Sequence, residues 1–430
     1  MKINHSLLKA TPLAVALCSG TAAEELPNPL SLDTAMHFAE HAHPELDLQL
    51  AQVDEHIARV SAARASYGLD ARLDVIPRFS DFAADPGRDL ENDSRVSLLL
   101  RKRWYDFGRT RSLTGAAEAE VAGEEALLLN VRQKRRLDIM RRFLAVILAD
   151  LKYLADDEEM SRLYVRYDKA RERQQLGMLA DVDILELETA YREALDIRAA
   201  TEAQRRYTRL QLALALGVPD ALPADLVRPR FPRLEEQTPD YQALFVEVAA
   251  GNPQLKNLRA RRDAAKLGVD AARSLRYPEL VTEVGANYLE RKVGTREAAR
   301  IDLQLRIPLY QGGIERAAAA EAEARLQQRE AELRSAEFVL RQELLRLLQQ
   351  LDVLRIERRT AKGREDYRDF AVDRARGIYE LELDTSLGES MARLTEAQYL
   401  SAKVEFETAM TWARLDSLMG ELPTYTSGKQ

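Results

Sequence analysis

Residues 300–310 read Arg-Ile-Asp-Leu-Gln-Leu-Arg-Ile-Pro-Leu-Tyr, and their apolar and polar side chains alternate. A period of two over about ten residues is typical of a β-strand with one apolar and one polar face. A strand of that length also crosses a lipid bilayer when tilted by ~45°. An antiparallel sheet in water shows the same alternation, so this stretch alone leaves both environments open.

Three other segments alternate in a similar way. The polar, turn-rich stretches 83–93 and 290–298 separate the members of each pair. We therefore expect four strands, at about 69–82, 94–103, 279–289 and 300–309.

The rest of the chain is suited to long helices. No proline lies between Pro86 and Pro219 or between Pro308 and Pro423, which leaves 132 and 114 residues without a helix breaker. Apolar residues there recur at spacings of three and four, with Arg, Glu, Gln and Asp between them. We expect long helices at about 109–175 and 313–378, each followed by a break and a helix that runs back. A plain coiled coil has the same helical content. Only the predicted strands distinguish such a coiled coil from a protein that combines long helices with a membrane-crossing sheet.

The two halves of the chain repeat one another. Four markers recur in one order at offsets of 203 to 210: His43-Pro44-Glu45-Leu46 with Asn252-Pro253-Gln254-Leu255, Tyr67-Gly68 with Tyr277-Pro278, Trp104-Tyr105-Asp106-Phe107-Gly108 with Pro308-Leu309-Tyr310-Gln311-Gly312, and Leu216-Gly217 with Met419-Gly420. Such self-similarity indicates a duplication. Each repeat is predicted to contain a first helix (about 32–66 and 241–275), two strands, a long helix and a returning helix. The predicted fold class is mainly α with β.

The predicted domain organisation follows from these markers. It comprises a signal peptide (1–23), a first repeat (24–218, with its helix hairpin at 109–216), a proline-rich connector (219–240), a second repeat (241–421, with its hairpin at 313–420) and a tail (422–430). Lysines, a short apolar stretch and Thr21-Ala22-Ala23 favour cleavage after Ala23. Cys18 raises the alternative of a lipoprotein signal, although Leu17 before it is large. A cytosolic N-terminus is the other alternative.

Composition excludes several classes. There is no run of about 18 apolar residues, hence no helical membrane span, and a single cysteine excludes a disulfide scaffold. The net charge of −7 gives no support to nucleic-acid binding. His37 and His41 have a metal-ligand spacing, but a solvated cluster explains them as well. Without a phosphate-binding glycine loop or a catalytic triad, we expect no enzyme activity, no cofactor and no resident metal.

The number of strands constrains assembly. A four-stranded sheet cannot stand in lipid with unpaired edges. Two chains would give eight strands, a barrel filled by its own side chains, whereas three chains would give twelve strands and leave a lumen. A trimeric 12-stranded β-barrel continued by a helical tunnel is the simplest closed arrangement.

The turn motifs carry a family resemblance. Ile307-Pro308-Leu309-Tyr310-Gln311-Gly312-Gly313, Tyr105-Asp106-Phe107-Gly108 and the two repeat starts make residues 30–421 resemble the TolC-type outer-membrane factors. The resemblance implies a homotrimer in the bacterial outer membrane with a large periplasmic α-helical barrel. It implies a passive exit duct of a tripartite efflux or type I secretion system, with drug, metal and protein substrates all open.

The same resemblance implies the partners, which are a periplasmic adaptor (membrane fusion) protein, an inner-membrane pump of the resistance-nodulation-division or ABC type, and outer-membrane lipid, with no nucleic acid. The alternative is a structural periplasmic coiled-coil scaffold without a pore. Such a scaffold has no need of ten-residue amphipathic strands.

Two groups of site residues belong to the strand ends. Gly108, Gly312 and Gly313 form the strand-to-helix turns. An aromatic belt at the membrane interface is expected from Trp104, Tyr105, Tyr67, Tyr277 and Tyr310, with junction packing as the alternative. The neighbouring cations Arg101, Lys102 and Arg103 are expected to meet anionic headgroups.

A third group lies at the helix tips, 176–184 and 381–389, which by the resemblance form the periplasmic entrance. Family members carry an aspartate six residues after a glycine, as Gly177 and Asp183 do. The second half departs from this pattern, with Glu382 and Gly388 at those places. We therefore expect an entrance constriction from Asp183, with Glu382, Asp384 and Glu389 as substitutes, and a preference for cations. Solvated tip charges are the alternative.

Overall fold

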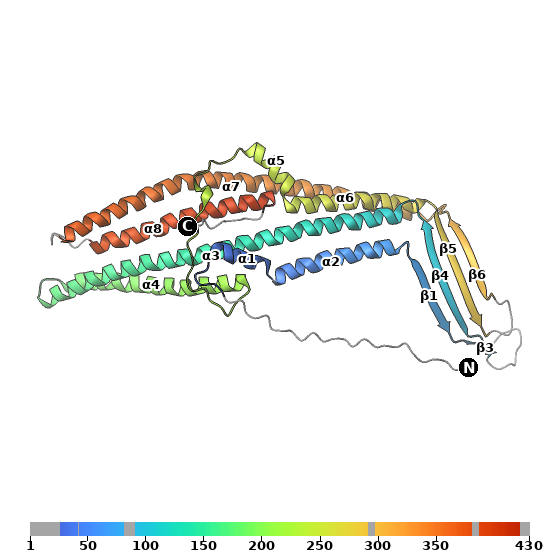
Figure 1. Cartoon of the computed structure of the whole chain (residues 1–430), viewed down its shortest axis with the longest axis horizontal. Coiled ribbons are helices and arrows are strands. Elements are labelled where there is room, and N and C mark those ends of the chain that lie inside the picture. Colours follow the sequence, from blue (N-terminus) through green and yellow to red (C-terminus); the bar gives the residue numbers. More distant parts are fainter. Residues whose placement is uncertain (1–25, 42, 81–90, 291–296, 381–386, 422–430) are drawn as a thin grey trace.

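The computed structural model describes residues 26–41, 43–80, 91–290, 297–380 and 387–421. Helices lie side by side along an elongated molecule, and a small sheet stands at one end of them (Figure 1). The helices are α1 (Leu32–His37), α2 (Pro44–Ala65), α3 (Arg109–Gln175), α4 (Asp181–Leu216), α5 (Tyr241–Gly251), α6 (Pro253–Arg273), α7 (Ile314–Glu380) and α8 (Leu387–Met419), with short 3₁₀ helices at Phe38–Glu40, Pro232–Glu235 and Ser274–Arg276. The strands are β1 (Leu69–Ile76), β2 (Phe79–Ser80), β3 (Glu91–Asn92), β4 (Arg95–Tyr105), β5 (Glu279–Leu289) and β6 (Ala299–Arg306).

Both repeats have the same order of elements, so the predicted mainly helical fold with a small sheet is confirmed. The order α2-β1-β4-α3-α4 returns as α6-β5-β6-α7-α8. The long helices α3 and α7 each contain 67 residues. At ~1.5 Å per residue each is a rod of about 100 Å.

The expectation of one continuous first helix in each repeat is wrong. The helical conformation is interrupted before Pro44 and again before Pro253, and each proline occupies the first turn of a new helix. Proline has no N–H and its ring clashes with the preceding turn, so a helix can begin with it but cannot run through it. The side chains of His43 and Asn252 cap the new helices.

Prolines also shorten two of the strands. The segment expected at 69–82 ends as β1 at Ile76, directly before Pro77, and the separate short strand β2 pairs only with β3. The strand expected at 300–309 ends at Arg306, two residues before Pro308. In both places proline removes a donor from the strand ladder.

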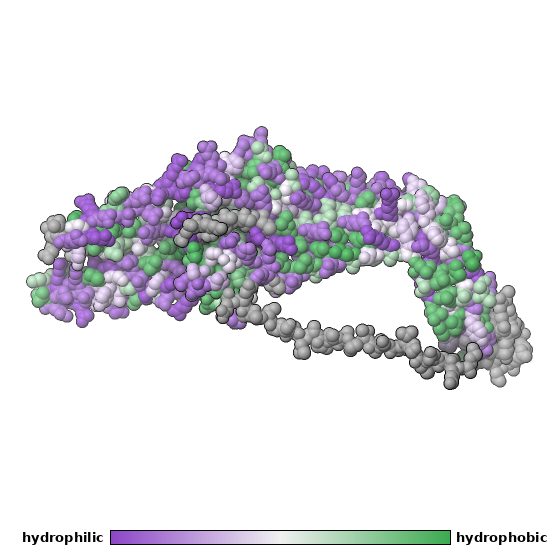
Figure 2. Space-filling model, in the orientation of Figure 1, coloured by the Kyte–Doolittle hydropathy of each residue, from purple (hydrophilic) through white to green (hydrophobic). Residues whose placement is uncertain are grey.

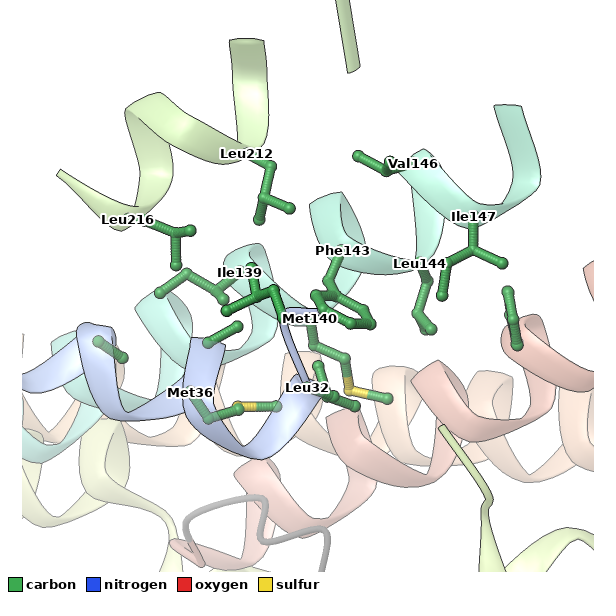
Figure 3. Close-up of a cluster of buried hydrophobic side chains, with 14 of the residues drawn as sticks. Leu32, Met36, Ile139, Met140, Phe143, Leu144, Val146, Ile147, Leu212 and Leu216 are labelled. Atoms are coloured by element: carbon green, nitrogen blue, oxygen red, sulfur yellow. The ribbon is translucent and has the colours of Figure 1, made fainter. Parts of the chain in front are cut away.

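The largest core lies about midway along the helices. Phe143, Met140 and Ile139 of α3 are fully buried there, and Leu32 and Met36 of α1 pack against them (Figure 3). Leu212 and Leu216 of α4 close the cluster from the other side. Phe406 and Ala409 of α8 belong to the same cluster, so the apolar stripe of α3 is covered by elements from both repeats.

Candidate functional site

The four long strands form one antiparallel sheet in the order β1-β4-β5-β6. The strands of the two repeats therefore adjoin in the middle, and β1 and β6 are its edges. Neither edge has a second partner strand among the described residues.

The pairing register sorts the side chains onto two faces. One face is apolar and carries Leu69, Ala71, Leu73, Val75, Val96, Leu98, Leu100, Leu280, Val284, Ala286, Tyr288, Ile301, Leu303 and Leu305. These side chains are largely uncovered, since Leu73 is 63% exposed and Ile301 is 78% exposed. Figure 2 shows hydrophobic residues gathered over the sheet, whereas most of the helical surface is hydrophilic. So large an exposed apolar surface marks a contact with lipid or protein.

The opposite face of the sheet is charged and internally paired. Arg306 contacts Glu279 at 3.3 Å and Glu283 at 3.2 Å. Arg101 lies 3.5 Å from Glu283, and Arg103 lies 3.6 Å from Glu279. The sheet therefore has the two-faced character that the alternation predicts.

The expected headgroup contacts of Arg101 and Arg103 are contradicted by these pairs, because both side chains lie on the charged face. Lys102 alone points to the apolar face, where its amine donates to the carbonyl of Tyr67 and lies 5.8 Å from the Trp104 ring centre. The cause is the strand pleat, which turns successive side chains to opposite faces.

The five residues of the predicted aromatic belt lie near the helical end of the sheet. Trp104 and Tyr105 are more than half exposed, and Tyr310 is exposed. Phe107 joins them, because its ring lies 4.8 Å from that of Tyr105 and 5.5 Å from that of Tyr277. Tyr67 is half-buried and donates its hydroxyl hydrogen bond to Asp106.

The first strand-to-helix turn depends on Asp106, which sequence reasoning did not select. Phe107 and Gly108 take positive φ values of 51° and 88°, so the chain reverses sharply into α3. The carboxylate of Asp106 accepts from the backbone N–H of Thr110 at 2.9 Å and from its hydroxyl at 2.5 Å. These bonds satisfy a free N–H of the first helical turn. The sequence feature that could have identified Asp106 is an acidic residue just before the start of a predicted helix.

Asp106 is 5% exposed and anionic. Burial raises the pKa of its carboxyl, but hydrogen bonds from Thr110 and Tyr67 together outweigh burial and leave that pKa below its ordinary value. A lowered folded-state pKa stabilises the protein above the unfolded-state pKa, and the stabilisation is lost as the pH falls through the folded-state value.

We expect Asp106→Ala to lower the free energy of unfolding by about 2–4 kcal/mol, because three hydrogen bonds to a buried carboxylate are lost. Thermal melts between pH 7 and pH 3 would measure it. The wild type should lose stability steeply below about pH 4, whereas the variant should lose less over the same range. Equal pH slopes would contradict the assigned role of Asp106.

The second turn has the same backbone but different side chains. Gly312 and Gly313 have φ values of 65° and 85° before α7 begins at Ile314. Phe107 therefore corresponds to Gly312, and Gly108 to Gly313. Equivalent turn residues of the two repeats are thus 205 positions apart. The sequence comparison placed them 204 apart, with Gly108 against Gly312, and is wrong by one residue. A second glycine replaces the strained Phe107, and Gln311 takes the place of Asp106.

The helix tips lie at the end of the molecule opposite the sheet (Figure 1). α3 ends at Gln175 and α4 begins at Asp181, with Gly177 at a φ of 71° between them. Asp183 is exposed in the first turn of α4, and Glu389 is exposed in the first turn of α8. Glu382 and Asp384 lie outside the described residues.

Ion pairs hold the α3–α4 hairpin along its length. Asp150 of α3 contacts Arg205 and Arg209 of α4, each at 2.8 Å. Among the described residues, no such pair joins α7 to α8. Ion pairs between helices thus stabilise the α3–α4 hairpin, whereas among the described residues the corresponding α7–α8 hairpin has none.

The histidines have separate roles. The imidazole of His43 accepts from the N–H of Glu45 at the start of α2, and His56 lies in the middle of that helix. Within the described ranges, no three His, Cys, Asp or Glu residues gather as a metal site. In the same part of the chain, no helix is long and apolar enough to cross a membrane.

Comparisons with known proteins give one family. Residues 244–421 match the family model "Outer membrane efflux protein". Protein CyaE of Bordetella pertussis is 25% identical over 316 residues, 71% of this chain and 66% of CyaE. The outer membrane efflux protein BepC of Brucella suis is 24% identical over 276 residues, 63% of this chain and 59% of BepC. The alignments thus span less than two thirds of either relative.

The fold is also that of a solved structure. The outer membrane protein VceC of Vibrio cholerae superposes with a TM-score of 0.71 at 18% identity. That match covers 91% of this chain and 96% of VceC, so it extends over both repeats.

Proposed function

Because the chain belongs to the outer membrane efflux protein family, we propose that it is the outer-membrane channel of a tripartite efflux or type I secretion system. It would be a passive exit duct, filled by an inner-membrane pump through a periplasmic adaptor. Members of the family are channels, and the transport step requires no covalent chemistry from this chain.

The sheet is the observation that carries this proposal. It has one uncovered apolar face, one charged face and two edge strands. Unpaired strand edges are not tolerated in lipid, so β6 of one copy must pair with β1 of the next. Three copies would close twelve strands into a barrel with the apolar face toward lipid and the charged face toward the lumen.

The helices support the same closure. α3 packs against α6 and α8 of the other repeat as well as against α2 and α4. By the internal repeat, α7 should make the equivalent contacts with α2 and α4 of a neighbouring copy. Exposed large apolar side chains lie on these three helices: Phe338, Val339, Val353, Ile356, Tyr367 and Phe370 of α7, Leu48, Leu50 and Ile57 of α2, and Leu185, Leu195, Ile197, Tyr207, Leu210 and Leu214 of α4. Burial in a trimer would remove them from water.

The proposed partners follow from the two ends of the duct. The sheet end would lie in the outer membrane, and the helix tips would meet the adaptor and, through it, the pump. A scaffold without a pore leaves the exposed apolar sheet face unexplained.

The proposed entrance lies at the tips. Asp183 is exposed in the first turn of α4, and a trimer would bring three copies of it around one axis. Glu382, Asp384 and Glu389 belong to the sequence of the equivalent tip in the second repeat. A ring of carboxylates attracts cations and repels anions. We therefore propose that this ring makes the closed duct cation-selective.

Single-channel recording in planar bilayers tests the proposal. We expect a small cation-selective conductance from the purified wild type. Asp183→Asn should lower the cation-to-anion permeability ratio by about twofold or more, because three carboxylates at the constriction lose their charge.

Asp196→Asn is the matched control, since it removes the same charge from an exposed site farther along α4. It should leave selectivity unchanged. If the wild type forms no channel and stays in water without detergent, the duct proposal fails. If Asp183→Asn behaves like the control, only the assignment of Asp183 fails.

A further inference from the structure

Two cations lie where the apolar face of the sheet ends toward the helices. They are Lys102 of β4 and Arg276, which directly precedes the segment leading into β5. Among the described residues, no carboxylate forms an ion pair with either of them.

Lys102 lies on the apolar face, opposite Leu69 and Thr282. Within the described part of the chain, its amine donates a hydrogen bond to the carbonyl of Tyr67 and to no other group, and it lies 5.8 Å from the ring centre of Trp104. Trp104 is 59% exposed and is fixed by a 2.9 Å hydrogen bond to the hydroxyl of Thr282. A cation over an exposed indole at the edge of an apolar surface is suited to the interface between lipid and water.

Arg276 has a similar setting. Its guanidinium lies 5.0 Å from the ring centre of Tyr277 and donates to the hydroxyl of that tyrosine at 3.0 Å. The ring of Tyr277 stacks on Phe107, which contacts Tyr105. This aromatic cluster connects Arg276 to the apolar face, because Tyr105 pairs with Leu280.

The charged face provides the contrast. Arg101 and Arg103 flank Lys102 in sequence, yet each lies beside a glutamate. These two arginines toward the proposed lumen are thus neutralised within the protein, whereas Lys102 on the apolar face and Arg276 at the helical end of the sheet are left for an external anion. The centre of the sheet also keeps them accessible, because β4 and β5 are its inner strands and copies would join only at β1 and β6.

We propose that Lys102 and Arg276 bind the phosphate groups of anionic phospholipids in the leaflet nearest the helices. Trp104, Tyr105 and Phe107 contact the glycerol and upper acyl region of these lipids. This inference rests on the proposed membrane location and goes beyond it by assigning the headgroup charge and the residues that hold it.

Native mass spectrometry of the detergent-purified protein tests the assignment. Equimolar phosphatidylglycerol and phosphatidylcholine serve as probes, because both have a phosphate but only the first has a net negative charge. One basic residue near a membrane surface favours anionic lipid by about fivefold. We therefore expect phosphatidylglycerol to be retained at least about fivefold better by the wild type, and this preference to disappear in Lys102→Gln/Arg276→Gln.

Two variants control for charge and folding. Lys169→Gln/Arg171→Gln removes the same charge from exposed sites near the tips and should keep the preference. Lys102→Arg should keep it as well, because the charge is conserved, so the proposal can be judged even if the double variant does not fold.

Several outcomes would overturn the inference. Equal retention of both lipids by the wild type is one, and an unchanged preference in a folded Lys102→Gln/Arg276→Gln protein is another. Displacement of phosphatidylglycerol by excess glycerol phosphate would show a site for soluble phosphate instead. Channel recordings on the same sample distinguish failure of the lipid inference from failure of the proposed function. If the protein conducts ions but shows no lipid preference, only the lipid inference is contradicted.

Discussion

Gly251→Ala is expected to prevent the protein from folding. A Cβ at this last residue of α5 would lie 1.9 Å from the carbonyl oxygen of Met419, at the end of α8. The Met419 atoms that the Cβ would meet belong to the backbone, so no side chain can move aside. The neighbouring Asn252 fixes this approach, because its amide donates to the carbonyl of Leu418 at 3.1 Å. The two chain segments would have to separate, at a cost of more than about 4 kcal/mol.

The matched control is Gly268→Ala in α6, where an added Cβ meets nothing within 4 Å. This change should stabilise the protein by roughly 0.5–1 kcal/mol, because alanine loses less conformational entropy than glycine in a helix. Circular dichroism melts and the yield of folded, detergent-extracted protein measure both variants. A Gly251→Ala protein that melts with the wild type would show that α5 and α8 do not approach so closely.

Ile301→Arg is expected to keep the chain out of the membrane. Ile301 lies near the middle of β6 on the apolar face and is 78% exposed in the single chain. An arginine facing lipid near the bilayer midplane costs ~2–4 kcal/mol. A trimer would place three of them there, so the cost triples. The helices should remain folded, because the sheet stands apart from them at one end (Figure 1).

Gln304→Arg provides the comparison on the same strand. Gln304 lies on the charged face and donates to Glu283 at 3.3 Å, so an arginine there can pair with that glutamate. Outer-membrane fractionation and gel analysis of oligomers would measure insertion. Normal insertion of Ile301→Arg, or equal loss with Gln304→Arg, would show that the apolar face does not contact lipid.

Much of the fold could be predicted because it depends on local patterns. The gaps between prolines and the apolar spacing of three and four predicted the long helices α3 and α7, and the alternation of Ile301, Leu303 and Leu305 predicted the faces of β6. The alternation along β4 likewise indicated that Lys102 lies on the apolar face and that Arg101 and Arg103 lie on the opposite face. The breaks before Pro44 and Pro253 were equally visible in the sequence.

The candidate site was less predictable. The positions of the turn glycines follow from the motif, but Asp106 acts through a bond to Tyr67, 39 residues earlier. The ion pairs of Asp150 with Arg205 and Arg209 likewise depend on how two helices face each other. The proposed roles of the tip acids and of the belt stay predictions.

By itself the sequence determined which segments are helix or strand, that they occur twice, and which side of each strand is apolar, since these properties depend on residues a few positions apart. Only the tertiary structure decided that β4 of one repeat pairs with β5 of the other, which leaves β1 and β6 as the edges. It also decided that the chain at Gly251 lies against that at Met419. The reason is that contacts between residues more than a hundred positions apart are set by how whole helices and strands pack, and no local periodicity records that.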